Sequence, residues 1–347
     1  PPVYPRPPVV TSLDFSPDGA LLAVAGFHEV LLHRADGGGL VARLIGLSER
    51  IESVKFSPDG TRLAVAGGLP ARMGELQIWD IAQRKLTLSV PVGYDTVYGV
   101  SWSPDGRLVA FGCPDNTLRA IDARNGEQVL HQGSHNDWVL GTAFSQDGSH
   151  IMSVGRDMST KLTEVETQRF VDNITSITPG ALRGGLHAIA RRPGRDEVVI
   201  GGADGVPQLY LVFRQAARKI GDNANLLRRF PAMEGRVFAV DYSPDGRLIA
   251  AASSLNGRGA VHFFAGEHDT AISESILKAY TKVATTYSAE EKKAIEEFTT
   301  RGTARTAAAE FPTAMYALAF SPDGARVAAA GEDGRVRFIR AADGTVT

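Results

Sequence analysis

The sequence predicts an all-β fold of seven similar units, because one five-residue phrase recurs at regular intervals between strand-like segments. An aromatic residue followed by Ser-Pro-Asp-Gly occurs at residues 15–19, 56–60, 102–106, 242–246 and 320–324. Residues 144–148 differ only by Gln in place of Pro, and residues 190–194 are a degraded copy that begins with Ala190. The first four intervals are 41 to 46 residues, close to the roughly 40–45 residues of one four-stranded propeller blade.

Each unit has the pattern of a four-stranded sheet. Apolar residues alternate before the phrase, as at 53–56 and 239–242, which is the period of a strand. In Ser-Pro-Asp-Gly, proline fixes φ, aspartate bonds nearby amides and glycine accepts a positive φ, so the phrase forms a turn. A short apolar strand such as 21–25 follows, then a third strand and a rim strand such as 129–131. We therefore expect residues 1–347 to form a single seven-bladed β-propeller.

Particular residues give the repeats a family resemblance. Trp79-Asp80 closes the third strand of its unit, and an aspartate precedes the third strand in four other units: Asp115, Asp157, Asp204 and Asp333. In these features the chain resembles WD40-repeat proteins. The resemblance implies that such an aspartate pairs with a histidine of the preceding loop, and His135 is the best match, in the fourth blade. The resemblance also implies that these residues have structural roles: Trp79, Asp80, Asp115, His135, Asp157, Asp204 and Asp333.

The interval between residues 242 and 320 is too long for one blade, and the excess, 268–301, has a helical pattern. One face of a first helix would carry Ile272, Ile276, Leu277, Tyr280 and Val283. A capping box from Ser288 to Glu291 would open a second helix through Ala294, Ile295 and Phe298. We expect a helical hairpin between the third and fourth strands of blade six. It would either cover the rim or dock a partner or a missing domain.

Closure of the ring is the second departure from regularity. The seventh unit ends at residues 343–347 with hardly any fourth strand. Either residues 1–10, half of them proline, supply an edge strand, or the natural chain continues past Thr347.

Composition and motifs argue against several functions. The 37 basic and 39 acidic residues give a net charge of −2. We therefore expect neither nucleic-acid binding nor electrostatic attraction to a membrane surface. No apolar run approaches the roughly 18 residues of a membrane span. Cys113 is the only cysteine, and nucleophile elbows, phosphate loops and zinc-protease motifs are absent. We therefore expect no catalytic residue, cofactor or metal.

A second resemblance concerns the protein's context. Residues 27–33, 133–138 and 170–178 are similar to propeller regions of large bacterial proteins that carry a cytochrome c-type domain elsewhere. This chain has no Cys-x-x-Cys-His motif of its own. The resemblance implies a protein partner that includes a c-type cytochrome domain or subunit, and a periplasmic or extracytoplasmic location.

The predicted binding site is the mouth of the central channel, where each first strand begins. Counting four residues back from each anchor of the phrase gives Thr11, Glu52, Tyr98, Leu140, Leu186, Phe238 and Tyr316. Counting six back adds Arg50, Trp138 and Arg236. Tyr, Trp and Arg dominate interface hot spots, so these residues would bind a protein partner. The alternative is that they only plug the channel entrance.

Two functions follow from this site. The first is a non-catalytic scaffold for protein–protein interaction within a larger bacterial assembly. The second is a propeller enzyme, a hydrolase or lactonase, with a metal in the central channel. The inner strands offer few polar side chains for such a site, and these have mixed charge: Asp14, Glu52, Lys55, His187 and Asp241.

Overall fold

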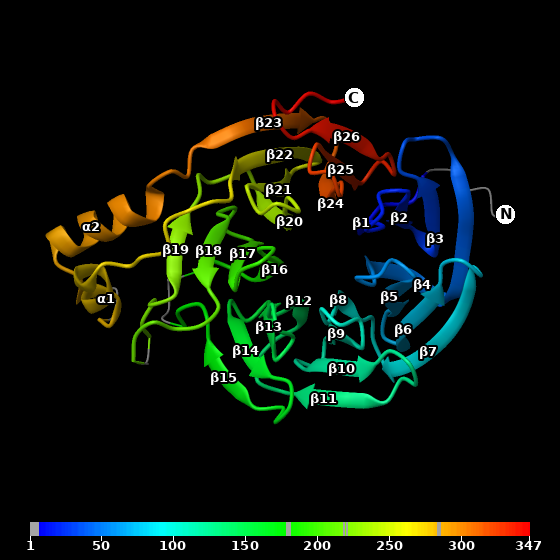
Figure 1. Cartoon of the computed structure of the whole chain (residues 1–347), viewed down its shortest axis with the longest axis horizontal. Coiled ribbons are helices and arrows are strands. Elements are labelled where there is room, and N and C mark those ends of the chain that lie inside the picture. Colours follow the sequence, from blue (N-terminus) through cyan, green and yellow to red (C-terminus); the bar gives the residue numbers. More distant parts are fainter. Residues whose placement is uncertain (1–6, 178–181, 218, 220, 283–285) are drawn as a thin grey trace.

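The computed structural model describes residues 7–177, 182–217, 219, 221–282 and 286–347. The strands form a ring of sheets around an open centre, as Figure 1 shows. Six sheets are present among the described residues, and the first sheet spans two repeat units. The described residues therefore contain seven repeats of the strand pattern, called here blades one to seven in chain order.

Blades one and two share a seven-stranded sheet in which the strands follow chain order. Its strands are β1 (Leu13–Phe15), β2 (Leu21–Ala25), β3 (Phe27–Arg34), β4 (Leu40–Phe56), β5 (Arg62–Leu69), β6 (Met73–Asp80) and β7 (Lys85–Gly93). Residues 40–45 of the long strand β4 pair with β3, whereas residues 50–56 pair with β5. One strand thus serves as the rim of blade one and as the inner strand of blade two.

Blades three to six are separate four-stranded antiparallel sheets. Blade three contains β8 (Tyr98–Trp102), β9 (Leu108–Gly112), β10 (Leu118–Asp122) and β11 (Gln128–Gln132). Blade four contains β12 (Val139–Phe144), β13 (His150–Gly155), β14 (Thr160–Glu164) and β15 (Phe170–Asn173). Blade five contains β16 (Leu186–Arg191), β17 (Glu197–Gly202), β18 (Gln208–Leu211) and β19 (Leu226–Arg229). Blade six contains β20 (Arg236–Tyr242), β21 (Leu248–Leu255), β22 (Arg258–Ala265) and β23 (Arg305–Phe311).

Blade seven has three strands, β24 (Met315–Phe320), β25 (Arg326–Gly331) and β26 (Arg337–Arg340). A single bridge between Ile339 and Val346 occupies the position of a fourth strand. Of the two alternatives for this strand, the one that draws on residues 1–10 gains no support from residues 7–10, which form no strand; residues 1–6 lie outside the described residues. The Val10 amide instead donates to Gly331 O at 2.9 Å and joins the two ends of the ring.

The Ser-Pro-Asp-Gly phrase forms the same hydrogen-bonded turn wherever it occurs. In blade one, the Ser16 hydroxyl donates to Asp18 Oδ1 at 2.5 Å and accepts the Leu21 amide at 2.8 Å. The glycine of each copy has a positive φ, +71° at Gly19. This turn fixes the distance between the first two strands and therefore the register of the blade.

Blade five corrects the predicted alignment of the degraded copy. The Arg192 amide donates to Glu197 O at 2.8 Å, just as the serine amide of the intact turns bonds the residue five positions on. Arg192 therefore stands in the serine position, and the anchor is Arg191, one residue later than the predicted Ala190. Arg192 is buried and pairs with the buried Glu197 at 3.1 Å, an ion pair that replaces the serine–aspartate bond.

The hydrophobic core lies between neighbouring blades. Valine, leucine and aromatic side chains of one blade pack on alanines of the next, which lets two sheets approach closely. At the seam between blades seven and one, the buried residues include Val10, Leu13, Phe15, Ala317, Ala319, Ala328 and Ala330.

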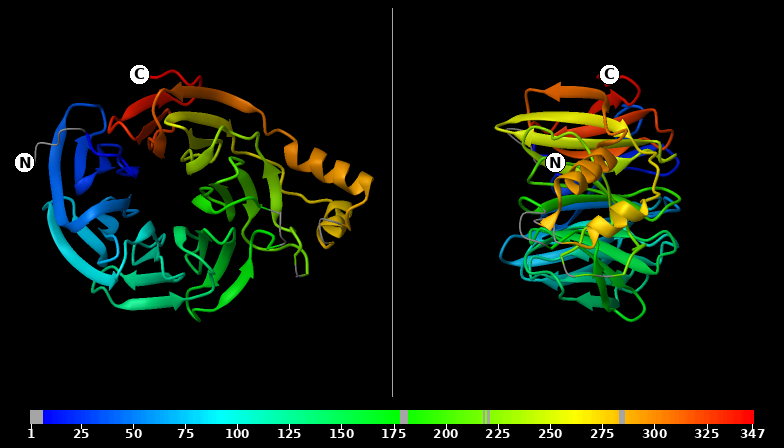
Figure 2. Two further views of the ribbon diagram at one scale, coloured as in Figure 1. Left: turned by 180° about the vertical axis from the view of Figure 1, so that it is seen from behind. Right: turned by 90° about the vertical axis from the view of Figure 1, so that its left-hand side faces the viewer.

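Two helices, α1 (Glu274–Tyr280) and α2 (Ala289–Thr300), lie between β22 and β23. Figure 2 shows that they project from the outside of the ring, and α2 packs beside β19 of blade five. Ser273 caps α1, and Ser288 with Glu291 forms a capping box on α2. Ile276 and Tyr280 are buried, but Ala294 is exposed, and Val283 lies outside the described residues. Neither helix is long and apolar enough to cross a membrane, a finding that covers the described residues only.

Candidate binding site at the channel mouth

The inner strands of the seven blades enclose a central channel of about 990 Å³. These strands are β1, β4, β8, β12, β16, β20 and β24, and they surround the centre of the ring in Figure 1. At one end, called here the mouth, the channel is lined by the residues with which these strands begin. Pro17, Pro58 and Pro104 of the Ser-Pro-Asp-Gly turns line it at the other end.

Seven of the ten predicted mouth residues line the channel, and Leu186, Trp138 and Arg236 do not. The lining residues include Arg50, Thr11, Glu52, Tyr98, Leu140, Phe238 and Tyr316. Leu186 does not line it: its side chain is buried in the core between blades. His187 takes this place, because the anchor of blade five is Arg191 and the count back from it shifts by one residue.

Trp138 and Arg236 lie beside the channel and are not among its lining residues. The Trp138 ring stacks on Tyr98 with their centroids 5.9 Å apart. The Arg156 guanidinium lies 4.7 Å from the Trp138 ring centroid, a cation–π contact. Arg236 begins β20 and is exposed. Arg156 is a residue of the mouth that the repeat count missed, because it lies in the turn after the second strand.

Aromatic side chains form an arc around the mouth. Tyr98 and Trp138 make one stacked pair. The Phe238 ring lies 5.4 Å from the His187 ring and 5.0 Å from the Tyr316 ring, which it meets edge to face. All five rings are partly exposed, so part of each ring is available at the surface of the molecule.

Charge is unevenly distributed around this arc. Arg50 Nε lies 2.7 Å from Glu52 Oε1, so this pair is internally compensated. Burial raises the pKa of the Glu52 carboxyl, and the Arg50 charge opposes that rise. Burial also raises the pKa of Tyr98 to about 12, with a contribution from Glu52. In contrast, burial lowers the pKa of His187, and the charges of Arg236 and Arg156 lower it further.

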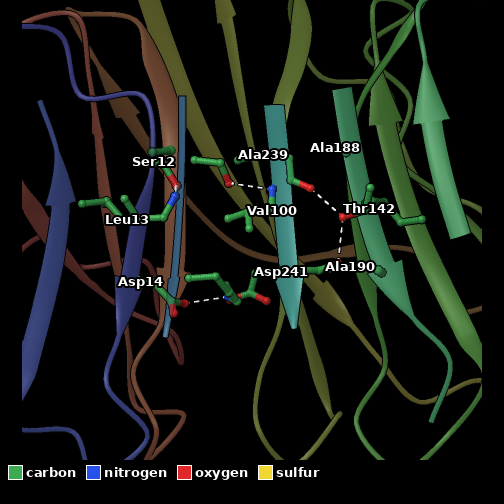
Figure 3. A pocket seen from close by; sticks show the side chains of 18 of the residues that line it. Ser12, Leu13, Asp14, Val100, Thr142, Ala188, Ala190, Ala239 and Asp241 are labelled. Atoms are coloured by element: carbon green, nitrogen blue, oxygen red, sulfur yellow. Dashed lines mark hydrogen bonds and ion pairs between the residues drawn. The ribbon is translucent and has the colours of Figure 1, made fainter. Parts of the chain in front are cut away.

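Inside the channel, two carboxylates join neighbouring blades. Asp14 accepts a hydrogen bond from Lys55 Nζ at 2.6 Å and from the Phe56 amide at 2.7 Å. Asp241 accepts the Phe320 amide at 2.9 Å. Figure 3 shows both carboxylates on the channel wall. Burial raises the pKa of both groups, although Lys55 opposes the rise in each.

This wall does not present the donor set that a metal-dependent enzyme would need. The carboxylates of Asp14 and Asp241 are engaged by backbone amides, and Lys55 occupies the space beside Asp14. In the described part of the chain, no three His, Cys, Asp or Glu side chains gather so that they could hold a metal ion. The alternative of a metal site in the channel therefore gains no support from these residues.

One turn aspartate makes the histidine pair that the family resemblance implies. His135 Nδ1 lies 3.0 Å from both carboxylate oxygens of Asp157, and His135 Nε2 lies 2.8 Å from Ser153 Oγ. Burial alone would raise the pKa of Asp157, but its hydrogen bonds, first that with His135, lower it to about 2. The pair ties the loop before blade four to the turn after its second strand.

The other turn residues have local partners. Asp115 and Asp333 bind arginines four residues later, Arg119 and Arg337. Asp204 accepts only the Val206 amide, at 3.0 Å, among the hydrogen bonds of the described residues. Asp80 accepts the Gln83 amide at 2.7 Å, and the Trp79 indole donates to Gln77 at 2.8 Å. These contacts hold turns and strands and lie away from the channel.

Comparisons with known proteins agree with this architecture. The family model "WD domain, G-beta repeat" matches residues 5–28, 126–163, 224–258 and 309–340. The model "Anaphase-promoting complex subunit 4 WD40 domain" matches residues 71–140. One solved structure, "Crystal Structure of Mitotic Checkpoint Complex", contains a chain with a TM-score of 0.70 at 19% identity, covering 96% of this chain and 87% of that one. At this identity the likeness concerns the fold alone.

Curated relatives match over shorter stretches. WD repeat and SOCS box-containing protein 1 of Danio rerio is 35% identical over 95 residues, 27% of this chain and 22% of the relative. Coronin-7 of Mus musculus is 28% identical over 188 residues, 50% of this chain and 20% of the relative. The chain thus spans about a fifth of these relatives. Together with the sheets, the matches support a WD40-type β-propeller fold for this chain.

Proposed function

We propose that this propeller is a non-catalytic scaffold that binds a protein partner at the mouth of its channel. The observation that carries the proposal is the arc of partly exposed aromatic residues, Tyr98, Trp138, Phe238 and Tyr316, around the mouth. Tyrosine and tryptophan supply much of the binding energy at protein interfaces, because they bury large areas at a low cost in side-chain entropy.

The blades themselves do not require large rings at this level. One residue further along each inner strand, the channel wall consists of small residues: Ser12, Ser53, Gly99, Gly141, Ala188, Ala239 and Ala317. Apart from the buried aromatic anchors at the other end of the inner strands, such as Trp102, large aromatic residues therefore gather at the mouth. This placement favours recognition of a partner over simple filling of the channel.

The wider setting of the scaffold is also a proposal. We infer an extracytoplasmic bacterial assembly with a c-type cytochrome domain or subunit, supported by the resemblance of residues 27–33, 133–138 and 170–178. The relatives reported above come from animals, so they do not bear on this setting. The complete reading frame in the source genome tests it: a cytochrome domain or a neighbouring cytochrome gene supports it, and their absence opposes it.

The binding proposal is tested with two substitutions that remove a side chain, Trp138→Ala and Phe238→Ala. Each is made in the full-length protein, which is isolated from its native source together with its partner. We expect each to weaken retention of the partner at least tenfold, a loss of roughly 1.4 kcal/mol or more. The melting temperature should change little, because both side chains are partly exposed.

Phe213→Ala is the matched control, because Phe213 is 40% exposed on blade five and its ring contacts His150, which follows a Ser-Gln-Asp-Gly turn. This variant should retain the partner fully. Full retention by Trp138→Ala and Phe238→Ala would contradict a binding site at the mouth.

A further inference from the structure

The electrostatics of the mouth distinguish one side of the aromatic arc from the other. On the side of blade two, Glu52 and Arg50 compensate each other at 2.7 Å. On the side of blades four to six, Arg156 has only a loose contact with Asp137, 3.7 Å apart, and both side chains are substantially exposed. Arg236 is exposed and makes no ion pair with any described residue. Positive charge is therefore in excess on the side of blades four to six.

The guanidinium groups of Arg156 and Arg236 both act on the His187 side chain. Arg236 and Arg156 each disfavour the charged form of His187 and lower its pKa, and no carboxylate opposes them there. The His187 ring in turn lies 5.4 Å from Phe238. The positive region thus adjoins the apolar surface formed by Phe238 and Tyr316, and a ligand could use both at once.

A cationic ligand fits this region poorly. The Trp138 ring already contacts a cation of the protein itself, the Arg156 guanidinium 4.7 Å from its centroid. A second cation would meet Arg156 and Arg236 as like charges, and like-charge placement is costly at an interface. A carboxylate would instead receive charge-assisted hydrogen bonds from two arginines.

We propose that the mouth recognises an acidic peptide segment, whose carboxylate lies between Arg156 and Arg236 and whose neighbouring apolar side chain packs on Phe238 and Tyr316. This inference rests on the proposed function, because it names the chemistry of the partner at the same site. The channel below the mouth, lined by small residues, has room for the apolar side chain.

The opposite side of the mouth limits how acidic the segment is. Glu52 is compensated by Arg50, but the Asp95 carboxylate acts on Tyr98 and the Glu332 carboxylate acts on Tyr316. A run of acidic residues across the mouth would meet these charges and be repelled. The segment should therefore carry one or two acidic residues on the side of blades four to six, next to an apolar residue.

The test uses the full chain and three libraries of capped octapeptides, random except for one central position. This position is fixed as Asp or Glu, as Asn or Gln, or as Lys or Arg. We expect the acidic library to retain the protein best, with retention falling between 50 mM and 500 mM NaCl because the contact is partly exposed. Arg156→Gln and Arg236→Gln should each weaken this binding about tenfold. Phe238→Ala should weaken it as well.

Arg247→Gln is the matched control, because Arg247 is a 73% exposed arginine of a Ser-Pro-Asp-Gly turn at the other end of the channel. It should bind the acidic library as the unmodified chain does. Preference for the basic or neutral library, or no effect of Arg156→Gln and Arg236→Gln, overturns the inference. If such binding is nevertheless lost in Phe238→Ala, the scaffold proposal stands and only the acidic chemistry fails. If no library is retained, the inference fails, and partner retention by Trp138→Ala and Phe238→Ala separately decides the scaffold proposal.

Discussion

At the scale of single residues, one buried pair distinguishes blade four from the other blades. His135 is fully enclosed and bonds Asp157 on one side and Ser153 on the other. Buried polar groups that are fully hydrogen-bonded hold a loop in one position, and loss of one partner leaves the other unsatisfied. The pair should therefore contribute measurably to stability.

We expect Asp157→Asn to lower the free energy of unfolding at pH 7 by roughly 2 kcal/mol. This expectation follows from the Asp157 pKa, which falls from 3.8 to about 2 on folding. Because the folded-state pKa is the lower one, this stabilisation is present above about pH 4 and is lost as the pH falls toward 2. Urea unfolding at pH 7, 4 and 3 should show the gap between variant and unmodified protein shrinking.

Asp115→Asn serves as the control for this measurement. The Asp115 carboxylate is 51% exposed and has no histidine partner among the described residues, so this change should cost well under 1 kcal/mol at pH 7. An Asp157→Asn variant that is as stable as the unmodified chain, or a gap that does not vary with pH, would refute the role assigned to the pair.

Sequence reasoning at this scale succeeded where a residue type has one obvious partner and failed where the repeat is degraded. The pair of His135 and Asp157 could be predicted, because the resemblance to WD40-repeat proteins implies that a turn aspartate pairs with a histidine of the preceding loop, and blade four has both residues. His187 could not be placed, because blade five lacks both the aromatic anchor and the turn serine. Arg156 was missed because its role depends on the neighbouring ring of Trp138, a contact that spacing does not encode.

At the scale of elements, the two helices depend on packing against blade five. The buried Tyr280 hydroxyl donates to Leu226 O at 3.0 Å, which fastens α1 to β19. Arg228 of β19 is also buried; it donates to Asp269 O at 2.9 Å and lies 4.8 Å from the Phe298 ring of α2. The helices therefore cover the outer edge of blade five, a position in which an open strand edge would otherwise be exposed.

We expect Tyr280→Ala to loosen the helices selectively, because it removes a large side chain buried to 1% exposure, at a cost of roughly 3–5 kcal/mol. Limited trypsin digestion should cut at the exposed Lys278, Lys292 and Lys293 much faster than in the unmodified chain. Tyr280→Phe keeps the ring and should cost only about 1 kcal/mol. Equal digestion of Tyr280→Ala and the unmodified chain would show that the helices are held by other contacts.

The helix pattern was readable because helical periodicity and caps are local. Ser288 and Glu291 were predicted as a capping box and form one. The first helix begins only at Glu274, because the Ser273 side chain caps it there, and Ala294 faces solvent, because α2 meets β19 mainly through its partly buried Ile295 and Phe298. Which blade the helices cover could not be inferred, since that depends on the path of the chain after β22.

At the scale of the whole molecule, the ring closes by packing. Blade seven contributes alanines and blade one contributes Val10, Leu13 and Phe15 to one buried cluster, with the Val10 amide bonded to Gly331 O. This seam resembles the seams between consecutive blades in composition and burial. The ring should therefore unfold as one unit, although its first and last blades are far apart in the sequence.

We expect Phe15→Ala at the closing seam and Phe144→Ala at the seam of blades three and four to cost similar amounts, roughly 3–5 kcal/mol each. Both variants should unfold in a single transition when fluorescence and circular dichroism are followed in urea. An early, separate transition in Phe15→Ala alone would mean that the ring opens at the closing seam before it unfolds.

The repeated blade pattern was predictable because the turn phrase marks each copy, whereas closure was not. Closure depends on where the two ends of the chain meet, and short proline-rich or irregular ends carry no periodic signal. The sequence left open a strand from residues 1–10 or a continuation past Thr347; residues 7–10 form no strand, and Val346 forms a bridge with Ile339 of β26.

The strand β4 also bears on how the ring can deform. Elsewhere, consecutive blades are separate sheets that meet through side chains and isolated hydrogen bonds such as that from Val10 N to Gly331 O, and each such seam is a joint at which two sheets can tilt. Blades one and two are one continuous hydrogen-bonded sheet through β4, so tilting between them would have to bend a strand. A ring of seven blades thus has six joints, and any breathing of its mouth should be concentrated on the side away from Glu52 and Arg50.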